Sequence, residues 1–342
     1  MTRPAFSRSV APTMSAPSPR GPSATYAANL ADVRAARERI LPFVHRTPLH
    51  TSRQLDERAG LSVFLKCEIF QRTGSFKARG ATSAVQKLDD ATAARGVVTH
   101  SSGNHAQALA WAARTRGIAA HVVMPTNAPA AKRAAVIGYG ARVVDCEPTL
   151  EARERTAAAV VAETGGTLIP PYDHPDVIAG QGTIALELAQ DVADLDAVVV
   201  PVGGGGMISG ITLALHELAP RVRVIGAEPL AADDAARSKA AGERLLQTDP
   251  RTIADGLRTS LGTLTWPVVR DLVTRIVTPT EDEIVSAMRF VFERVKLVIE
   301  PSAAVGVAVV LGEALREDPS LRKVAVVLCG GNVDLDRLPW QR

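Results

Sequence analysis

The sequence predicts an α/β fold with two open, mainly parallel twisted sheets that carry helices on both faces. Short β-branched runs alternate with amphipathic stretches of about ten residues or more, which is typical of parallel sheets covered by helices. The strand candidates are too numerous for one comfortable sheet, so two sheets are expected. A length of 342 residues is enough for two domains that each bury a core.

The strand candidates are runs rich in valine and isoleucine, as expected for strands buried on both faces. They are VFLK (63–66), VVTH (97–100), AHVVM (120–124), RVVDC (142–146), AVVVPV (197–202), VRVIGAE (222–228), RIVTP (275–279) and VAVVLC (324–329). The helix candidates between them have apolar residues at helical spacing. Examples are SFKARGATSAVQKL (75–88), HAQALAWAARTRG (105–117), EARERTAAAVVAETGG (151–166), GTIALELAQDVA (182–193) and EDEIVSAMRFVFERV (281–295).

Composition excludes several classes of protein. The net charge is +3 and no basic stripe is present, so the sequence gives no indication of nucleic-acid binding. The sequence contains no uninterrupted run of eighteen apolar residues, so no membrane span is predicted. The three cysteines (Cys67, Cys146 and Cys329) form no C-x-x-C pair, so neither a disulfide framework nor a thiolate zinc site is expected, and a reducing cytoplasm fits best. Residues 1–24 are rich in Pro, Ser and Ala and are expected to be a disordered tail.

The stretch TGSFKARG (73–80) places Lys77 in the first turn of an expected helix, directly behind Phe76. The positive end of the helix dipole disfavours an ammonium there by about 0.3 to 1 kcal/mol and lowers its pKa. A lysine that loses its proton easily becomes the neutral amine that attacks a carbonyl. Lys77 is therefore a candidate nucleophile.

Two loops join a strand to a helix in a way that suits anions. Gly203, Gly204, Gly205 and Gly206 expose bare backbone N–H groups before a helix that begins near Met207, which suits a phosphate. The pattern is neither G-x-G-x-x-G nor a P-loop, and the alternative is a tight strand-to-helix turn.

In the second loop, Ser101, Ser102, Gly103, Asn104 and His105 follow the strand that ends at His100. Hydroxyls, an amide and backbone donors at a helix N-terminus can hold a carboxylate. The alternative is simple N-capping, which explains one hydroxyl but not the whole cluster. The side chain of His105 fits a structural donor better than an acid or base.

The motifs SFKARG, SSGNHAQAL, GGGG before a helix, and CGGN occur in this order, and together they resemble the fold type II family of pyridoxal-phosphate enzymes. The resemblance is to the threonine and serine dehydratase and serine racemase group, and it runs from about residue 27 to residue 338. It implies a fold like that of the tryptophan synthase beta chain and a homodimer. We expect residues 25–95 and 173–342 to form a large cofactor-binding domain and residues 96–172 to form a small inserted domain.

The resemblance implies a set of cofactor contacts. Lys77 would join covalently to the cofactor aldehyde, Phe76 would pack near the pyridine ring, and Asn104 would hydrogen-bond the ring hydroxyl. The phosphate would lie on the four glycines and Met207, while Gly256 would lie against the other face of the ring.

Cys329 stands where the family places a neutral partner of the pyridine nitrogen. A neutral partner leaves that nitrogen less protonated and the ring a weaker electron sink, which favours quick elimination over long-lived carbanions. Cys329 at this position therefore favours the expectation of a dehydratase. Its alternative is a small buried residue that ends a core strand.

The substrate and metal sites are implied in the same way. Ser101, Ser102, Gly103 and His105 would hold the substrate carboxylate, with Lys77 as base and either Ser102 or the cofactor phosphate as acid. Arg153 would meet a second carboxylate; a solvated helix face is its alternative. Glu228, the carbonyl of Ala232, and Asp234 would bind Mg²⁺ or Ca²⁺, and the alternative is an acidic helix N-terminus. Glu300, before a proline, reads as a helix boundary.

The expected reaction is dehydration and deamination of L-threonine or L-serine to a 2-oxo acid and ammonia. Serine racemase and 3-hydroxyaspartate dehydratase are the alternatives within the family. A non-catalytic phosphate sensor is disfavoured by the intact Lys77, and a nicotinamide dehydrogenase is disfavoured by the missing G-x-G-x-x-G.

Overall fold

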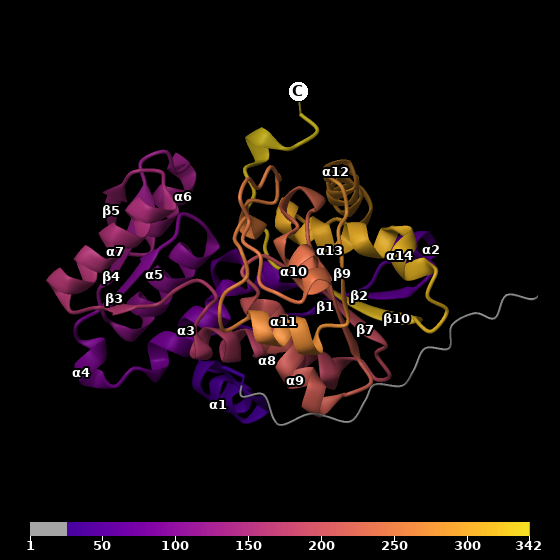
Figure 1. Cartoon of the computed structure of the whole chain (residues 1–342), viewed down its shortest axis with the longest axis horizontal. Coiled ribbons are helices and arrows are strands. Elements are labelled where there is room, and N and C mark those ends of the chain that lie inside the picture. The colour runs from indigo at the N-terminus through magenta and orange to yellow at the C-terminus, as the bar shows by residue number, and fades with distance from the viewer. Residues whose placement is uncertain (1–25, 342) are drawn as a thin grey trace, which may run out of the picture.

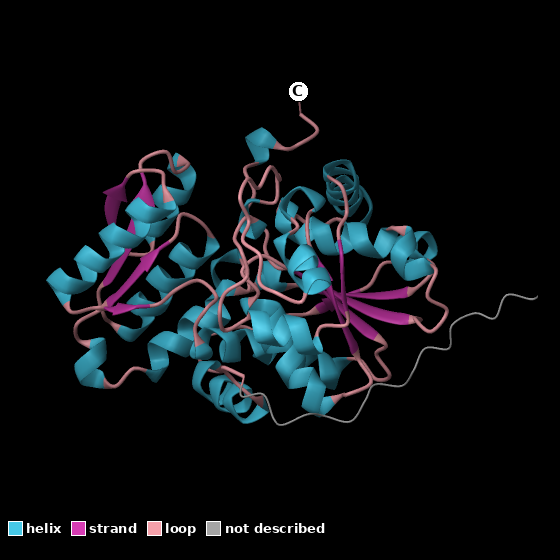
Figure 2. Ribbon diagram, viewed as in Figure 1, coloured by secondary structure: helices cyan, strands magenta, loops and turns pink. Residues whose placement is uncertain are grey.

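The computed structural model describes residues 26–341, so the expectation for residues 1–24 lies outside this range. Two sheets form the framework, as Figures 1 and 2 show. The larger sheet has the order β1 (Leu49–His50), β2 (Ser62–Lys66), β10 (Lys323–Val327), β7 (Ala197–Pro201), β8 (Arg223–Ala227) and β9 (Arg275–Val277). The smaller sheet has the order β5 (Arg142–Cys146), β4 (Ala120–Pro125), β3 (Val97–His100) and β6 (Thr167–Leu168).

All strand pairs are parallel except β1 with β2, which confirms the expected fold class. Each of the eight runs picked out from the sequence forms a strand, with ends that differ by one or two residues. The prediction missed β1 and β6, because two residues are too few to give a periodic signal. The smaller sheet comes entirely from residues 97–168; the division of the chain into domains stays a prediction.

Helices cover both faces of each sheet. In chain order they are α1 (Leu30–Ile40), α2 (Arg53–Ala59), α3 (Lys77–Lys87), α4 (Asp90–Ala93), α5 (Asn104–Arg116), α6 (Ala130–Gly138), α7 (Leu150–Thr164), α8 (Pro175–Asp191), α9 (Gly206–Leu218), α10 (Asp234–Ala241), α11 (Trp266–Leu272), α12 (Glu281–Phe290), α13 (Pro301–Leu311) and α14 (Glu313–Arg316). Helices α8 and α9 lie on one face of the larger sheet and α13 on the other, while α5 and α7 enclose the smaller sheet (Figure 1).

Helix α8 begins earlier than the expected 182–193, because His174 caps it. The Nδ1 atom of His174 accepts the backbone N–H of Asp176, and Pro175 occupies the first helical position, where its missing N–H costs nothing. Helix α12 begins as its capping box predicts, with Thr280 and Glu283 bonded to each other's backbone N–H groups. It then passes into a π-helical turn over Val291–Val295.

Glycines bring three helices unusually close together. A Cβ on Gly210 of α9 would lie 2.2 Å from the carbonyl oxygen of Ile178 in α8, and a Cβ on Gly180 would lie 2.7 Å from Cα of Gly80 in α3. Larger side chains at these positions would force the helices apart. Because α3 begins at Lys77 and α9 at Gly206, this packing fixes Lys77 relative to the glycine loop.

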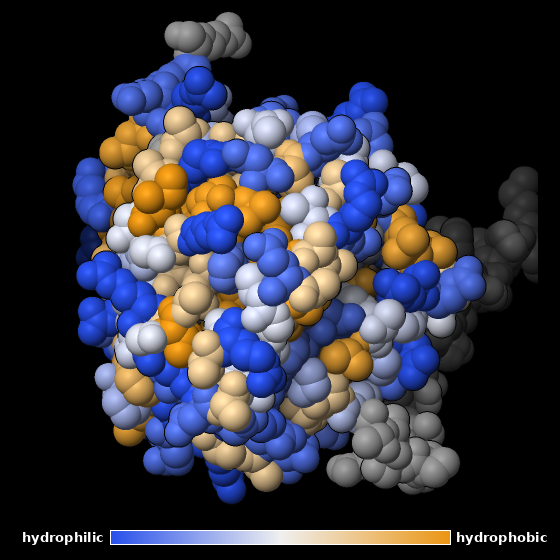
Figure 3. All heavy atoms as spheres, turned by 90° about the vertical axis from the view of Figure 1, so that its left-hand side faces the viewer, coloured by the Kyte–Doolittle hydropathy of each residue, from blue (hydrophilic) through white to orange (hydrophobic). Residues whose placement is uncertain are grey.

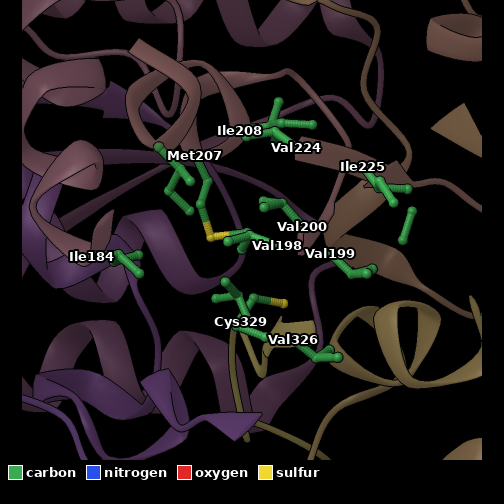
Figure 4. Close-up of a cluster of buried hydrophobic side chains, with 14 of the residues drawn as sticks. Ile184, Val198, Val199, Val200, Met207, Ile208, Val224, Ile225, Val326 and Cys329 are labelled. Atoms are coloured by element: carbon green, nitrogen blue, oxygen red, sulfur yellow. The ribbon is translucent and has the colours of Figure 1, made fainter. Parts of the chain in front are cut away.

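The core of the larger sheet is a cluster of aliphatic side chains from β7, β8 and β10 and the helices around them (Figure 4). On the side of the molecule formed by α4 to α7, hydrophilic residues separate small groups of apolar ones (Figure 3). Among residues 26–341, no helix is both long enough and apolar enough to cross a bilayer.

Candidate active site

Lys77 is the first residue of α3, and its neighbours come from distant parts of the chain. Its Nζ donates a hydrogen bond of 2.7 Å to the carbonyl oxygen of Pro171 and lies 4.9 Å from the centre of the Phe76 ring. The backbone N–H of Phe76 donates to the carbonyl of Cys329 at 3.0 Å, and Ser75 pairs with Gly330 in an isolated bridge. The SFKARG and CGGN motifs therefore meet at one point.

The amine of Lys77 is poised to lose its proton. Burial lowers its pKa from 10.5 to about 8, while Cys329 and Glu300 oppose the shift. The sequence argument attributed a lowered pKa to the helix dipole, whereas the structure makes desolvation the dominant cause. A neutral amine at moderate pH is what attack on an aldehyde requires.

This pKa predicts how cofactor-free protein should react with pyridoxal phosphate. The rate of covalent attachment, followed by absorbance, should rise about tenfold between pH 7 and pH 9 and then level off, because the neutral fraction of an amine with a pKa of about 8 saturates there. An ordinary solvent-exposed amine, measured alongside, should keep gaining rate to about pH 10. If the rate of attachment to the protein also kept rising to about pH 10, the lowered pKa of Lys77 would be contradicted.

The glycine loop between β7 and α9 has no room for side chains. A Cβ on Gly204 would lie 2.3 Å from the ring of Tyr172, and Gly205 has φ +86°, a conformation that favours glycine. The four glycines lead into the N-terminus of α9, whose first N–H groups have no acceptor within the helix, and such a terminus suits a phosphate. Figure 4 shows the Met207 side chain directed into the apolar core.

Tyr172 is a residue that the sequence reading missed. Its ring packs on Gly204, and its Cβ and backbone lie against Gly206. Tyr172 follows Pro171, and Asp173 after it accepts N–H bonds of 2.9 and 2.8 Å from Thr263 and Leu264. Nothing in the stretch PPYDH has the form of a site motif, so only the tertiary contact reveals it.

The second loop is open toward a space that a ligand can enter. Ser101, Ser102 and Gly103 are half-buried, and a Cβ on Gly103 would meet no atom within 4 Å. Helix α5 begins at Asn104, so its first N–H groups face this loop. The arrangement suits a carboxylate, as the sequence predicted.

The side chain of His105 cannot donate to that carboxylate. Its Nε2 lies 2.9 Å from the carbonyl oxygen of Ile169, which only accepts, so Nε2 carries the ring proton and Nδ1 is bare. Burial, with a smaller effect of the charge on Lys77, lowers the pKa of His105 to about 3 and keeps the ring neutral. The predicted contact with the substrate is therefore restricted to the backbone N–H of His105, and the side chain is the structural donor that the sequence suggested.

Asn104 is held by the carboxylate of Glu300, which the sequence analysis interpreted only as the boundary of a helix. Glu300 is indeed the N-cap residue of α13, but its side chain makes no capping bond. It accepts instead from Nδ2 of Asn104, at 2.9 and 3.1 Å, and only 4% of it is exposed. Burial raises the pKa of Glu300 to about 7.

Cys329 lies near Lys77 and Glu300, while Gly256 lies against Gly203 of the glycine loop. Cys329 is buried after β10, at the edge of the cluster in Figure 4, and burial followed by the charge of Glu300 raises the pKa of its thiol well above its usual range. The thiol is thus a neutral group. The N–H of Gly256 donates to Oγ of Ser302 at 3.1 Å, and Asp255 before it pairs with Lys132 of α6.

Arg153 lies in the first turn of α7, and its side chain is half-buried. Burial lowers the pKa of His100 at the end of β3; Glu154 opposes this, and the charge of Arg153 adds to it. The Nε of Arg153 is buried and has no hydrogen-bond partner among residues 26–341. A buried donor without a partner is costly, and a fully solvated helix face does not account for it.

Glu228 and Asp234 form a separate pair at the start of α10. The oxygens of Glu228 accept from the backbone N–H groups of Ala235 and Ala236, at 2.9 and 2.8 Å. Oδ2 of Asp234 accepts from Leu261 at 3.0 Å, whereas its Oδ1 is buried and has no partner in the described part of the chain. Burial raises the pKa of Glu228 to about 8 and that of Asp234 to about 6.

The donor set at this pair suits a hard cation. The described residues contain no cluster of three or more His, Cys, Asp or Glu side chains suited to a metal. The predicted metal ligands are only two carboxylates, with the backbone carbonyl of buried Ala232 as the third ligand, so a cluster of three such side chains is not required. Oxygen ligands of this kind fit Mg²⁺ or Ca²⁺. Helix α10 also begins at Asp234, as the alternative reading required.

Comparisons with known proteins agree with the motifs. The pyridoxal-phosphate dependent enzyme family matches residues 40–330. A serine racemase of Arabidopsis thaliana is 51% identical over 92% of this chain and 96% of its own length. A beta-hydroxyaspartate dehydratase of Paracoccus denitrificans is 53% identical over 90% of this chain and 98% of its own. The crystal structure of a threonine deaminase from T.th. superposes with a TM-score of 0.84 at 46% identity, covering 90% of this chain and 99% of that one.

Proposed function

The chain belongs to the pyridoxal-phosphate dependent enzyme family, and from this premise we propose that it removes water from a 3-hydroxy amino acid that carries a second carboxylate. The class is that of 3-hydroxyaspartate, and the products are a 2-oxo acid and ammonia. The observation that carries this choice is Arg153, whose buried Nε lacks a partner beside the serine loop. A substrate carboxylate would supply one.

The main expectation from the sequence, L-threonine or L-serine dehydration, has weaker support. The methyl group or hydrogen on Cβ of these substrates gives the Arg153 guanidinium nothing to bind and would leave its buried Nε without an acceptor. The 53% identical relative is named for beta-hydroxyaspartate, while the threonine deaminase is 46% identical. The alternative drawn from the sequence is therefore the better supported of the two.

The residues of the site fit pyridoxal phosphate. The N–H groups of the loop 203–206 and the N-terminus of α9 would hold the phosphate, since the loop residues themselves carry no side chains. Asn104 would donate to the ring oxygen, Cys329 would face the ring nitrogen as a neutral thiol, and Gly256 would lie along the ring face. When bound, this cofactor supplies the electron sink that lets a proton leave the α-carbon of an amino acid.

Two side chains of the chain then handle protons. Nζ of Lys77, which burial keeps neutral above a pH of about 8, takes the proton from Cα. The bond from Cβ to the hydroxyl oxygen breaks, and the hydroxyl leaves as water with a proton from Ser102, to which the proton taken up by Lys77 returns. In the released enamine a proton moves from nitrogen to Cβ. A second water then adds at Cα, releases the nitrogen as ammonia and leaves the 2-oxo acid, so atoms and charge balance.

Serine racemisation is the second candidate. It is favoured by the half-exposed hydroxyl of Ser102, next to the open space in front of Gly103, because a second proton donor there can return a proton to Cα. The 51% identical relative named serine racemase also supports this second candidate.

A substrate panel with one variant tests the choice. The wild-type protein should release keto acid and ammonia faster from 3-hydroxyaspartate than from L-serine or L-threonine. Arg153→Met should lower kcat/KM for 3-hydroxyaspartate by roughly a hundredfold and leave that for L-serine almost unchanged, since only the former loses an ion pair.

The matched control is Arg155→Met, two residues along the same helix, whose exposed guanidinium lies 3.7 Å from Glu151. It should behave as wild type. Equal losses on all substrates in Arg153→Met, or a wild-type preference for L-serine, would overturn the proposed substrate class. Faster appearance of D-serine than of keto acid would move the second candidate to first place.

We also propose that Glu228, the Ala232 carbonyl and Asp234 bind Mg²⁺ or Ca²⁺. Asp234 Oδ2 accepts from Leu261, and the next N–H, of Gly262, lies 3.3 Å from the carbonyl of Gly204, so a cation here would order the segment against the phosphate loop. Chelation should therefore lower the thermal midpoint and weaken cofactor binding. A cation at about a hundred times its Kd adds about 2.7 kcal/mol to the free energy of unfolding.

Differential scanning calorimetry with EDTA, then with added Mg²⁺ or Ca²⁺, checks this. Asp234→Asn should abolish the response to the cation, whereas the exposed Asp249→Asn should keep it. A midpoint that ignores both chelator and cation would refute the site.

Two further assignments belong with this proposal. We expect a homodimer, which sedimentation velocity of the purified protein would test. We also expect a reducing, cytoplasmic setting, because Cys67, Cys146 and Cys329 are all free thiols in the structure.

A further inference from the structure

We propose that Glu300 and Asn332 are positioning residues that fix the side-chain amide of Asn104, so that it presents an N–H group, and not its oxygen, to the cofactor. The inference rests on the placement of pyridoxal phosphate proposed above. It concerns how the site holds the cofactor, and it is independent of which amino acid is the substrate.

One end of the network is a backbone carbonyl. Nδ2 of Asn332 donates to the carbonyl oxygen of Thr73 at 2.8 Å and to Oδ1 of Asn104 at 2.9 Å. Because a carbonyl oxygen can only accept, it requires the amide nitrogen of Asn332 to face it. That nitrogen in turn requires an acceptor on Asn104, which is Oδ1.

The other end is a carboxylate that has little freedom to move. A Cβ on Gly330 would lie 2.5 Å from Oε1 of Glu300, and the N–H of Glu300 donates to the carbonyl of Gly330 at 3.0 Å. The carboxylate accepts from Nδ2 of Asn104. The Thr73 carbonyl, acting through Asn332, therefore fixes the orientation of the Asn104 amide from one side, and the Glu300 carboxylate, in its ionised form, specifies the same orientation from the other.

Turning the Asn104 amide over would break both contacts. Its oxygen would face the Glu300 carboxylate, and its nitrogen would face the nitrogen of Asn332. Each is a repulsion in a buried setting, where unpaired polar groups cost about 1 to 3 kcal/mol each. The amide is thus held in one of its two orientations before any ligand arrives.

This orientation leaves one donor free. The two oxygens of Glu300 lie on one side of Nδ2 and share a single N–H, since the two N–H bonds of an amide diverge by about 120°. The second N–H points elsewhere and is available to an oxygen in the site. A fixed donor favours the ionised form of a ring hydroxyl over the protonated form.

A double-mutant cycle tests this with cofactor binding as the readout. Asn104→Ala should weaken the affinity of cofactor-free protein for pyridoxal phosphate about tenfold, and shift the absorbance of the bound cofactor toward the shorter-wavelength form with a protonated ring oxygen. Glu300→Gln and Asn332→Ala should each cause the same spectral shift and weaken affinity by at least about threefold.

The cycle distinguishes positioning from general structural support. When Glu300→Gln is added to Asn104→Ala it should cause almost no further loss, because its effect acts through Asn104. The exposed Glu317→Gln serves as the matched control and should bind as wild type. Thermal unfolding of every variant shows that it is folded, and Asn332→Ala provides the same cycle if Glu300→Gln does not fold.

Additive losses in the double variant, or a wild-type spectrum in both Glu300→Gln and Asn332→Ala, would overturn the proposal. A wild-type spectrum and affinity in Asn104→Ala would overturn it at its base. None of these outcomes depends on the substrate panel, so a wrong substrate class and a wrong network are distinguishable.

Discussion

Replacing Lys77 with alanine is expected to abolish turnover and covalent attachment of the cofactor together. In the proposed mechanism one amine is both the nucleophile toward the aldehyde and the base at Cα, and a positioned general base alone contributes about 10² to 10⁴ in rate. We therefore expect a loss of at least about 10⁴ in kcat. Borohydride reduction followed by peptide mass spectrometry should find the cofactor on Lys77 in the wild type and on no residue in the variant.

The same change should not destabilise the fold. In the unfolded chain the lysine is charged below its ordinary pKa of 10.5, whereas burial keeps it neutral in the folded protein above about 8. Holding it buried at pH 7 therefore costs stability, and its removal should leave the thermal midpoint equal or higher. Lys87→Ala, at the far end of the same helix, is the control and should keep full activity. Turnover that survives in Lys77→Ala would refute the mechanism.

The sequence was sufficient for the framework because the framework is encoded locally. Buried parallel strands are written as continuous valine and isoleucine runs, and the ends of β3, β7 and β10 lead directly into the loops that form the site. Lys77, the four glycines and the serine loop occupy the places that their motifs indicated. Each depends on a strand followed by a helix, which a reader can recognise within about twenty residues.

The remainder depends on contacts between distant segments. Glu300 looks like a capping residue before a proline, and only the fold places it against Asn104. Tyr172 carries no motif-like signal, yet it packs on the glycine loop. Asn332 ends the CGGN motif, but only the fold shows that its side chain completes the amide network. The tautomer of His105 in α5 is likewise set by the carbonyl of Ile169, which follows β6 and lies 64 residues further along the chain. Motifs identify backbone sites, while side-chain orientation comes from tertiary neighbours.

Arg79 offers the largest expected effect on stability. It lies two residues after Lys77, is 1% exposed, and donates to Glu68 and Glu187 at 2.8 and 2.7 Å. Lys66 completes the cluster through Glu187 at 2.6 Å, so two buried cations balance two buried anions. Burial opposes ionisation of Glu187, but the two cations outweigh it and hold the pKa of Glu187 below its ordinary value.

Arg79→Met should lower the free energy of unfolding by about 3 to 5 kcal/mol, measured as a fall in the urea midpoint. The loss comes from the buried Glu68 carboxylate that is left without its cation, and not only from the lost attraction between Arg79 and its carboxylate partners. Glu68 would keep only its 2.6 Å hydrogen bond from Thr47. Neutralising that anion should restore part of the loss, so Arg79→Met with Glu68→Gln should be more stable than Arg79→Met alone. If the double variant were the less stable of the two, the cluster would not be acting through charge balance.

Because α3 begins at Lys77, the cluster also fixes where Lys77 lies. Cofactor affinity should therefore fall in Arg79→Met and recover in the double variant, in parallel with stability.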